Sequence, residues 1–341
     1  MRKILFRVDA SVKIGYGHLI RCTCIALYAK EHSVDCLFIL KNSDENVQEM
    51  LREKDLAYII ITKEADLLEI KNGDKILVVD VNNPVLFKET GEYKNYLLFL
   101  KEKGFKIVLF EDFVKDVFPA DLVIIPYVNA EDLGYNNTPG TQYLLGPDYF
   151  VFRAEFALSP KVVIREEVKN IFVCMGGSDP GKLTEKITRQ FAGYPNAFHL
   201  NIVFAQLDDA RRENLESLLH AYKGSYKILI NPPFISSVMR NSDLGIINSG
   251  LIKYETCVMG LPCISLSNNT FQEKMMQVFA DKNILCHIGI ASEVTDQMFY
   301  TALDSIVRDR EKRSTVSQNS LRLCDGKGVE RIFEKMQNLK N

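Results

Sequence analysis

The residues best suited to catalysis lie in a short turn near the amino terminus, where Gly15, Tyr16, Gly17 and His18 are consecutive. Glycine lets the backbone turn tightly and approach a ligand closely, and the N–H groups of a helix that begins there point at an anion. Histidine titrates near neutral pH, which suits a general base or a hydrogen-bond donor to phosphate. We therefore expect His18 to be catalytic, although a glycine turn beside a surface histidine would give the same pattern.

A second glycine turn, Gly176-Gly177-Ser178, lies near the middle of the chain and again follows an apolar run directly. Asp179 and Pro180 come next, and this pair is typical of an N-cap and the first residue of a helix. The pattern predicts another strand–loop–helix site for an anion. A tight turn that binds no ligand is the alternative.

The third candidate segment runs from residue 234 to residue 255. An apolar strand ends at Ile247, Ser249 and Gly250 form a turn, and a helix carrying Glu255 follows. A carboxylate at this place could accept hydrogen bonds from both hydroxyls of a ribose, as acidic residues do in other nucleotide sites. The spacing fits a solvated helix residue equally well.

Alternating strands and helices must position these segments. The expected strands are rich in Val, Ile, Leu and Phe rather than alternating, which is typical of parallel strands covered on both faces. Helical stretches between them predict βαβ crossovers and doubly wound sheets. The expected strands are Ile4–Val8, Asp35–Leu40, Tyr58–Ile61, Ile76–Asp80, Lys106–Phe110, Leu122–Ile125, Asn170–Cys174, Leu200–Phe204, Tyr226–Ile230, Leu244–Ile247, Cys263–Leu266 and Ile284–Ile288.

The length of 341 residues indicates two domains. Loop signals gather before residue 150, and the strand–glycine–helix pattern restarts afterwards, so we place the boundary near residue 160. The expected domains are residues 1–160 and residues 161–341, with ligands bound in a cleft between them at the carboxyl ends of strands. The last amphipathic helix, about 328–339, fits either packing against the first domain or membership of the second.

The composition excludes several functional classes. Hydrophobic residues make up 47%, charged residues 25%, and the net charge is −2 without any basic run, so we expect no nucleic-acid partner. No segment approaches the roughly 20 apolar residues of a membrane helix, and the amino-terminal apolar run is too short for a signal peptide. The eight cysteines form no zinc pattern. We expect a cytoplasmic protein with no membrane insertion, no metal and no cofactor.

The candidate segments together resemble a known family. Residues 7–11, 14–18 and 21–22 are similar to the signature of UDP-sugar hydrolases of the pseudaminic acid pathway and of the related spore-coat polysaccharide biosynthesis proteins. Residues 145–149, 153–156 and 176–179 resemble the same family's later motifs. Residues 234–272 are similar to the nucleotide-binding half of the peptidoglycan N-acetylglucosaminyltransferase. The resemblance implies a GT-B fold, with two facing Rossmann-like, doubly wound α/β domains.

The resemblance also implies an activity, namely hydrolysis of a UDP-linked 2,4-diacetamido-2,4,6-trideoxy sugar to UDP and free sugar. His18 would activate the water, while the second domain would hold most of the UDP. The backbone of Phe234 and Ile235 would read uracil, and Glu255 would bind the ribose. The substrate-binding residues that the resemblance implies are Asp9, Gly15, Tyr16, Gly17, Arg21, Asn82, Gly176, Gly177, Ser178, Phe234, Ile235, Ser249, Gly250, Leu251, Glu255, Asn269 and Gln272.

Three positions depart from the family pattern. Leu251-Ile252 stands where the family usually has Ser-Thr, which removes two hydroxyl donors to phosphate. Asn82 replaces an aromatic residue, and Phe271-Gln272 replaces an Asn-Gln pair. Two other functions therefore stay open: a glycosyltransferase that passes the sugar to an acceptor other than water, and a UDP-sugar-binding protein with reduced activity.

Overall fold

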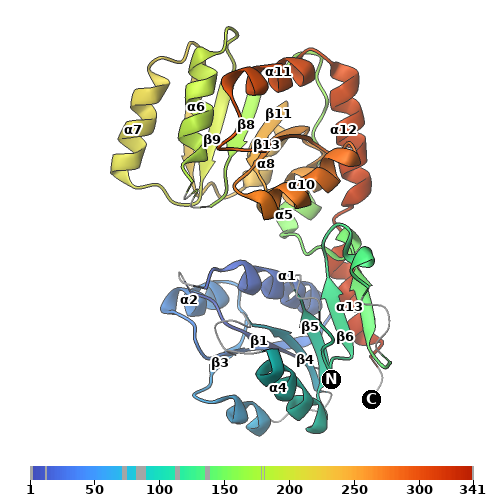
Figure 1. The fold of residues 1–341 in the computed structure, drawn as a ribbon. Helices are drawn as coiled ribbons and strands as arrows, with labels where there is room; N and C mark the ends of the chain where they lie inside the picture. The colour runs from blue at the N-terminus through green and yellow to red at the C-terminus, as the bar shows by residue number, and fades with distance from the viewer. Residues whose placement is uncertain are drawn as a thin grey trace. The chain divides into compact units, whose positions relative to one another are not determined.

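The computed structural model describes residues 3–11, 14–70, 75–81, 90–111, 116–134, 139–177, 179 and 181–339. The chain divides into two compact units, one of residues 1–153 with 326–341 and one of residues 154–325 (Figure 1). The division falls slightly before the expected boundary at residue 160. The carboxyl-terminal segment belongs to the first unit, which is the first of the two alternatives left open for the last helix.

The first unit contains a seven-stranded parallel sheet in the order β3-β2-β1-β4-β5-β6-β7. The order reverses between β1 and β4, which are hydrogen-bonded neighbours in register from Lys3 with Lys75 to Val8 with Asp80. The strands are β1 Lys3–Val8, β2 Asp35–Leu40, β3 Tyr58–Ile60, β4 Lys75–Asp80, β5 Lys106–Phe110, β6 Leu122–Ile125 and β7 Gln142–Leu145.

Helices connect these strands on both faces of the sheet, because successive crossovers run in opposite directions from β1 and β4. Figure 1 shows α1 on one side and α4 on the other. Asp44 caps α2 by accepting a hydrogen bond from the Val47 N–H. The helices are α1 Gly17–Glu31, α2 Glu45–Glu53 and α4 Thr90–Glu102, with short 3₁₀ turns η1 Glu64–Glu69, η2 Ala130–Leu133 and η3 Pro147–Tyr149.

The last helix, α13 Gly328–Gln337, packs in the core of the first unit. Its buried Ile332, Phe333 and Met336 share one cluster with strand residues such as Phe6. The Phe333 ring lies edge-on to Tyr28 of α1, with centroids 5.4 Å apart. The apolar stripe of this helix therefore completes a core that the preceding chain leaves open.

The second unit contains a six-stranded parallel sheet in the order β10-β9-β8-β11-β12-β13. Renumbered from its own first strand, this is the order 3-2-1-4-5-6 of the dinucleotide-binding Rossmann fold. The strands are β8 Asn170–Cys174, β9 His199–Phe204, β10 Ser225–Ile230, β11 Leu244–Asn248, β12 Cys263–Ser267 and β13 Cys286–Ile290.

The helices of the second unit are α5 Ala154–Ala157, α6 Leu183–Gly193, α7 Asp209–Leu219, α8 Ile235–Arg240, α9 Ile252–Met259, α10 Thr270–Asp281, α11 Asp296–Val307 and α12 Arg310–Leu323. Buried Arg313 of α12 donates to the carbonyls of Ile306 and Val307 at the end of α11, and to those of Arg165 and Glu166. One guanidinium thus ties the end of α11 to the segment that leads into β8. None of the described helices is both long enough and apolar enough to cross a membrane.

The two parallel sheets confirm the expected α/β class, with two differences. Strand β7 was not expected, because its four residues lie between glycine- and proline-rich loop signals. The last strand is Cys286–Ile290 rather than 284–288. Ile284 and Leu285 are buried in the turn after α10, so their apolar character reports burial rather than strand pairing.

Candidate functional site

Each sheet has a point where its strand order reverses, and ligands of open α/β sheets bind at the carboxyl ends of the strands there. In the first sheet this point lies between β1 and β4, and in the second it lies between β8 and β11. The Gly15 turn follows β1, and the Gly176 turn follows β8. Both expected glycine turns therefore lie at the switch points of their sheets.

The first turn is held by its own backbone. Gly15 has a φ of +92°, a left-handed conformation that favours glycine, and its N–H donates to the Ser11 carbonyl at 2.7 Å. Helix α1 begins at Gly17, and no side chain caps it. The Tyr16 hydroxyl donates to Asp44 Oδ2 at 2.9 Å, so this ring ties the turn to the start of α2.

His18 faces a buried carboxylate. Its Nδ1 lies 2.8 Å from Oδ1 of Asp80, the last residue of β4. The Asp80 side chain is 1% exposed, whereas that of His18 is 21% exposed. A carboxylate only accepts hydrogen bonds, so a proton on Nδ1 satisfies this contact and leaves Nε2 as a proton acceptor.

Arg21 lies one turn further along α1 and binds the same carboxylate through two of its guanidinium nitrogens. Its Nε lies 2.5 Å from Asp80 Oδ2 and its Nη2 lies 2.6 Å from Oδ1; Nη2 is also 3.1 Å from His18 Nδ1. The guanidinium carbon lies 4.5 Å from the centre of the Phe110 ring. Arg21, expected to bind substrate, thus makes a bidentate pair with Asp80.

This pairing fixes the charge of Asp80. Burial by itself raises the pKa of a carboxyl group, but the charge and hydrogen bonds of Arg21, with the contact to His18, outweigh burial here. The pKa of Asp80 is lowered to about 2. Asp80 is therefore ionised at neutral pH and holds the imidazole in one tautomer and one orientation.

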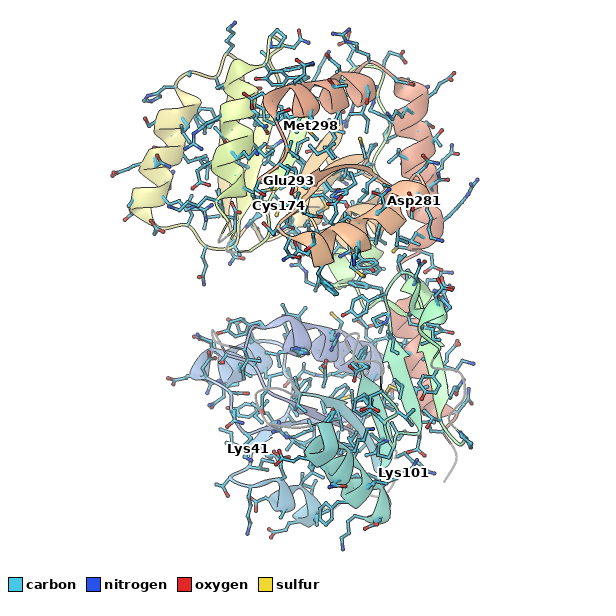
Figure 2. All side chains as sticks on the ribbon, viewed as in Figure 1. Lys41, Lys101, Cys174, Asp281, Glu293 and Met298 are labelled. Atoms are coloured by element: carbon cyan, nitrogen blue, oxygen red, sulfur yellow. The ribbon has the colours of Figure 1, made fainter. Side chains whose placement is uncertain are left out.

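Asp9, also expected to bind substrate, serves the framework around the turn. Its Oδ2 accepts from Arg7 at 2.8 Å, and its Oδ1 accepts from the backbone N–H groups of Lys41 and Asn42. The Nζ of Lys41, which is labelled in Figure 2, lies 3.4 Å from Glu64 Oε1. Glu64 also pairs with Arg7. Burial tends to raise the pKa of Asp9, yet these hydrogen bonds lower it. The cluster fixes the carboxyl ends of β1 and β2.

The second turn is built around Asn248, the last residue of β11. Its Nδ2 donates to the Met175 carbonyl at 2.6 Å, and its Oδ1 accepts from the Gly250 N–H at 3.0 Å. Gly176 has a φ of +93°, and a Cβ there would lie 2.9 Å from Asn248 Nδ2. Figure 2 marks Cys174 at the end of β8, just before this turn. Asn248 therefore joins the two turns that follow β8 and β11.

Helix α6 begins later than the sequence predicts. The sequence predicts Asp179 as the N-cap, but the helix begins at Leu183 with Lys182 as its N-cap residue; Pro180, the expected first helical residue, lies outside the described residues. Asp179 still accepts from the Leu183 and Thr184 N–H groups, both at 2.9 Å. Its φ of +42° allows this longer reach. The amino terminus of α6 is thus satisfied by a carboxylate of the protein itself.

A polar network links the turn after β11 with the start of α10. The Ser249 hydroxyl donates to Gln272 Oε1 at 2.5 Å, and the Asn268 N–H donates to the same oxygen at 2.9 Å. Asn269 caps α10 by accepting from the Gln272 N–H at 3.0 Å. The structure thus brings the expected residues Ser249, Asn269 and Gln272 together at one edge of the sheet.

Lys253 turns away from solvent. Its side chain is 7% exposed, and its Nζ donates to the carbonyls of Ser249 and Gly250 at 2.9 and 3.3 Å. Burial lowers its pKa to about 8. Lys253 therefore supports the turn, and its ammonium group does not replace the hydroxyl donors lost at Leu251-Ile252.

Glu255 is half-buried in the first turn of α9. Burial raises the pKa of the Cys174 thiol to about 12, and the charges of Glu255 and Asp179 act in the same direction. Glu255 thus acts electrostatically on Cys174, the last residue of β8, which directly precedes the second glycine turn.

Large apolar side chains are exposed in the same loops. Phe234 precedes α8 and is 63% exposed, Leu251 precedes α9 and is 53% exposed, and Phe271 in the first turn of α10 is 64% exposed. Ile235, half-buried, begins α8, and the next N–H, that of Ser236, donates to Glu155 Oε2 at 3.0 Å. Glu155 belongs to residues 153–156, one of the segments in which the sequence resembles the family's later motifs.

Two expected residues, Asn82 and Ser178, lie outside the described residues. Two further residues, Asp80 and Asn248, were not among the expected site residues. Asp80 contacts His18 after the first turn, and Asn248 links the turns that follow β8 and β11. Each is a polar residue that ends a buried strand at a switch point. That position is the signal that would have revealed them.

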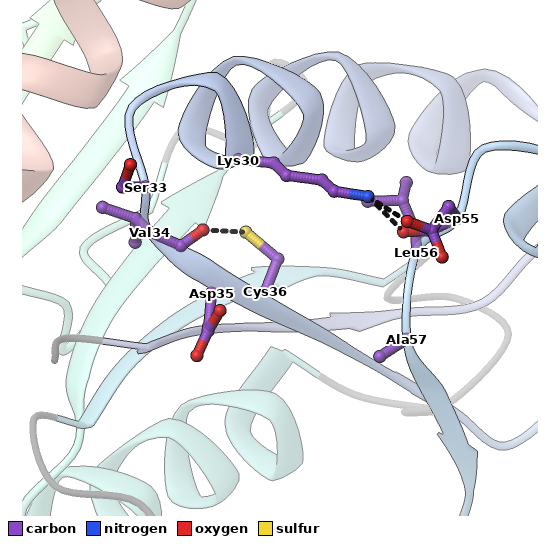
Figure 3. Close-up of a pocket in the computed structure, with 8 residues that line it drawn as sticks. All are labelled: Lys30, Ser33, Val34, Asp35, Cys36, Asp55, Leu56 and Ala57. Atoms are coloured by element: carbon purple, nitrogen blue, oxygen red, sulfur yellow. Dashed lines mark hydrogen bonds and ion pairs between the residues drawn. The ribbon is translucent and has the colours of Figure 1, made fainter.

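A depression of about 360 Å³ lies at the opposite, amino-terminal edge of the first sheet (Figure 3). It is lined by residues such as Asp35 at the start of β2 and Asp55, whose carboxylate pairs with Lys30 at 2.5 Å. It contains none of the expected site residues. Within the described part of the chain, no three His, Cys, Asp or Glu side chains could share a metal ion.

No model of a known protein family matches the chain. Curated relatives do match. The chain is 27% identical over 302 residues to an uncharacterized protein of Methanocaldococcus jannaschii, covering 85% of this chain but only 61% of that relative's length. It is 24% identical to the spore coat polysaccharide biosynthesis protein SpsG of Bacillus subtilis, over 97% of this chain and 96% of that protein.

A third relative carries the name of an enzyme. The chain is 25% identical to the UDP-2,4-diacetamido-2,4,6-trideoxy-beta-L-altropyranose hydrolase of Campylobacter jejuni, over 75% of this chain and 88% of that protein.

Solved structures establish the fold class. MurG of Acinetobacter baumannii matches with a TM-score of 0.70 at 12% identity, over 99% of this chain and 100% of that chain. The UDP-GlcNAc 2-epimerase of Neisseria meningitidis bound to UDP-GlcNAc matches with a TM-score of 0.66 at 13% identity, over 98% and 99%. Together with the two parallel sheets, these likenesses show a GT-B fold made of two Rossmann-like units.

Proposed function

We propose that this chain is a UDP-sugar hydrolase of surface-polysaccharide or nonulosonic acid biosynthesis, and that His18 is its general base. The main observation in support is the contact of His18 Nδ1 with the buried Asp80 carboxylate at 2.8 Å. This contact lies at the switch point of the first sheet, and His18 directly follows a glycine turn. The name of the Campylobacter relative supports the substrate class, and that of the Bacillus relative supports a role in polysaccharide biosynthesis.

The arrangement suits activation of water. Asp80 stays ionised and fixes the Nδ1–H tautomer, in which the Nε2 lone pair can accept a proton from water. The oxygen of that water attacks the anomeric carbon of the sugar, and the bond from this carbon to the diphosphate oxygen breaks. UDP leaves with the electron pair, and the proton remains on His18 until solvent removes it.

The second glycine turn suits the nucleotide. Gly176 lets the backbone come close to a ligand, and the neutral Asn248 holds the turn without placing a charge beside a diphosphate. Half-buried Glu255 can accept from ribose hydroxyls, and the exposed ring of Phe234 offers an apolar surface to the uracil.

The start of α9 suits the diphosphate better than the start of α6. The N-cap residue of α9, Leu251, has no polar side chain that could cap the helix, whereas Asp179 already occupies the amino terminus of α6. Backbone N–H groups and the helix dipole at α9 can therefore stabilise the negative charge that develops on the leaving UDP. This placement needs no hydroxyls at Leu251-Ile252.

A phosphorus NMR time course with UDP-2,4-diacetamido-2,4,6-trideoxyaltrose, without an acceptor, tests the proposal. We expect free UDP with the wild type and at least a hundred-fold slower release with His18→Ala. His220→Ala is the matched control, because His220 is exposed at the end of α7 and should leave the rate unchanged.

Two outcomes would each contradict one part of the proposal. Undiminished release by His18→Ala would exclude His18 as the base. UDP release that begins only after an acceptor sugar is added would instead favour a glycosyltransferase, the other reaction that a GT-B protein with this site could perform.

A further inference from the structure

A buried ion cluster beside the second glycine turn has no part in the reaction described so far. Arg211 lies in the first turn of α7 and donates from Nη2 to Asp179 Oδ2 at 2.7 Å. It also donates from Nε and Nη2 to the two carboxylate oxygens of Glu185, both at 2.8 Å. Asp179 and Glu185 are 2% exposed and Arg211 is 12% exposed.

Arg211 is itself held on several sides. Its backbone N–H donates to the Asp208 side chain that caps α7, at 2.8 Å. Its guanidinium carbon lies 5.2 Å from the centre of the Phe204 ring at the end of β9. A planar guanidinium with five donors can serve two carboxylates at once, which a lysine ammonium does less well.

The cluster acts on the glycine turn through Asp179. The Asp179 carboxylate spans from Arg211 to the N–H groups at the start of α6, while its backbone follows the Gly176 turn closely in the chain. The Ala205 N–H donates to the Gly177 carbonyl at 3.2 Å, so the loop after β9 supports the turn from the same side. Asn248 supports it from the side of β11.

We propose that Arg211 is a positioning residue for the UDP site: by neutralising and orienting Asp179, it fixes the second glycine turn for the diphosphate. This inference rests on the proposed function, because it assigns that turn to UDP. Arg211 is not proposed to contact the substrate itself. Its role is to keep the Asp179 carboxylate turned toward α6 and paired, rather than left as a negative charge beside the phosphates.

Arg211→Lys tests this role with little change of net charge. We expect the Kd for UDP and the KM for the UDP-sugar to rise about ten-fold, with kcat within two-fold of the wild type, because the fork that holds both carboxylates is lost. Arg212→Lys is the matched control. Arg212 is the next residue of α7, is 49% exposed and pairs with the exposed Glu216 of the same helix, so this variant should bind UDP normally.

A second pair of variants separates positioning from loss of fold. If Arg211 acts through Asp179, Arg211→Lys should change the Kd for UDP less than two-fold in an Asp179→Asn background, because the two effects are coupled. UDP titration by calorimetry measures all four proteins, and circular dichroism checks that each is folded.

The outcomes distinguish this inference from the function on which it rests. If Arg211→Lys binds UDP as tightly as the wild type, or if the ten-fold loss is equal in both backgrounds, Arg211 does not position the turn. If the wild type itself fails to bind UDP, the assignment of the turn and this inference both fail.

Discussion

The two glycine turns of this chain begin alike and end differently. Gly15 and Gly176 each follow the first strand of a parallel sheet, at its switch point, with φ values of +92° and +93°. Helix α1 starts at Gly17 without a side-chain cap, and its second residue is His18. The start of α6 lies further along the chain and is capped by Asp179. The same sequence signal therefore leads to two different electrostatic environments.

The residue that faces each turn from the neighbouring strand makes the difference sharper. Asp80 ends β4 and presents an ionised carboxylate to His18, whereas Asn248 ends β11 and presents a neutral amide to the Met175 carbonyl and the Gly250 N–H. A carboxylate suits a general base that must gain positive charge. An amide suits a turn beside a diphosphate, where a negative charge would repel the ligand.

Asp80→Asn should give the largest effect. An amide at this position can present its N–H₂ to Nδ1 and favour the wrong imidazole tautomer, so we expect kcat for UDP release to fall about a thousand-fold. Steady-state kinetics with the UDP-sugar measures it. Asp55→Asn is the control, because Asp55 is 94% exposed and pairs with Lys30 away from the turn. A loss below ten-fold would show that Asp80 does not orient the base.

Asn248→Asp makes the second switch point resemble the first. The new carboxylate faces the Met175 carbonyl without a donor and adds a negative charge near the proposed diphosphate site. We expect UDP affinity to fall about a hundred-fold, equivalent to about 3 kcal/mol. Calorimetric titration measures it, and an unchanged Kd would mean that the diphosphate lies elsewhere.

Lys253 offers a test through pH. Its pKa is about 8 in the folded chain against an ordinary value of 10.5. Between these values the unfolded chain binds more protons than the folded chain, so stability rises with pH in this window. From pH 8 to pH 10 the wild type should gain about 2 kcal/mol relative to Lys253→Met. Urea unfolding of both proteins at the two pH values measures the difference.

Cysteine and tyrosine titration in the same range is common to both proteins, so the comparison isolates Lys253. Equal pH dependence in the two proteins would place the ammonium group in solvent, contrary to its contacts with the Ser249 and Gly250 carbonyls.

Gly15→Ala and Gly176→Ala should show the smallest difference between the two turns, in the free energy of unfolding. Gly15→Ala meets open space, so only the left-handed backbone opposes it, at about 1 kcal/mol. Gly176→Ala meets the same backbone cost and also displaces Asn248 Nδ2, 2.9 Å from the new Cβ. We expect Gly176→Ala to lower the free energy of unfolding by about 1 kcal/mol more than Gly15→Ala does, as measured by urea unfolding. Equal effects would mean that Asn248 moves freely.

Much of this architecture follows from the sequence. Continuous apolar runs predict the parallel strands, because both faces of each sheet are covered, and two glycine turns predict where the sites begin. The partners Asp80 and Asn248 depend on which strands become neighbours, which local sequence does not specify. Asp179 caps the start of α6 from a left-handed backbone conformation with a φ of +42°, which local sequence does not specify. The position of α13 depends on a core formed by residues far away in the chain.

In the proposed function the first turn carries the chemistry and the second holds the nucleotide. Calorimetric titration of UDP against Asp80→Asn and Asn248→Asp, side by side with the wild type, tests it most directly. We expect Asp80→Asn to bind UDP within two-fold of the wild type although it turns over slowly, while Asn248→Asp loses most of its UDP affinity. Loss of UDP affinity in Asp80→Asn, with normal binding by Asn248→Asp, would contradict it.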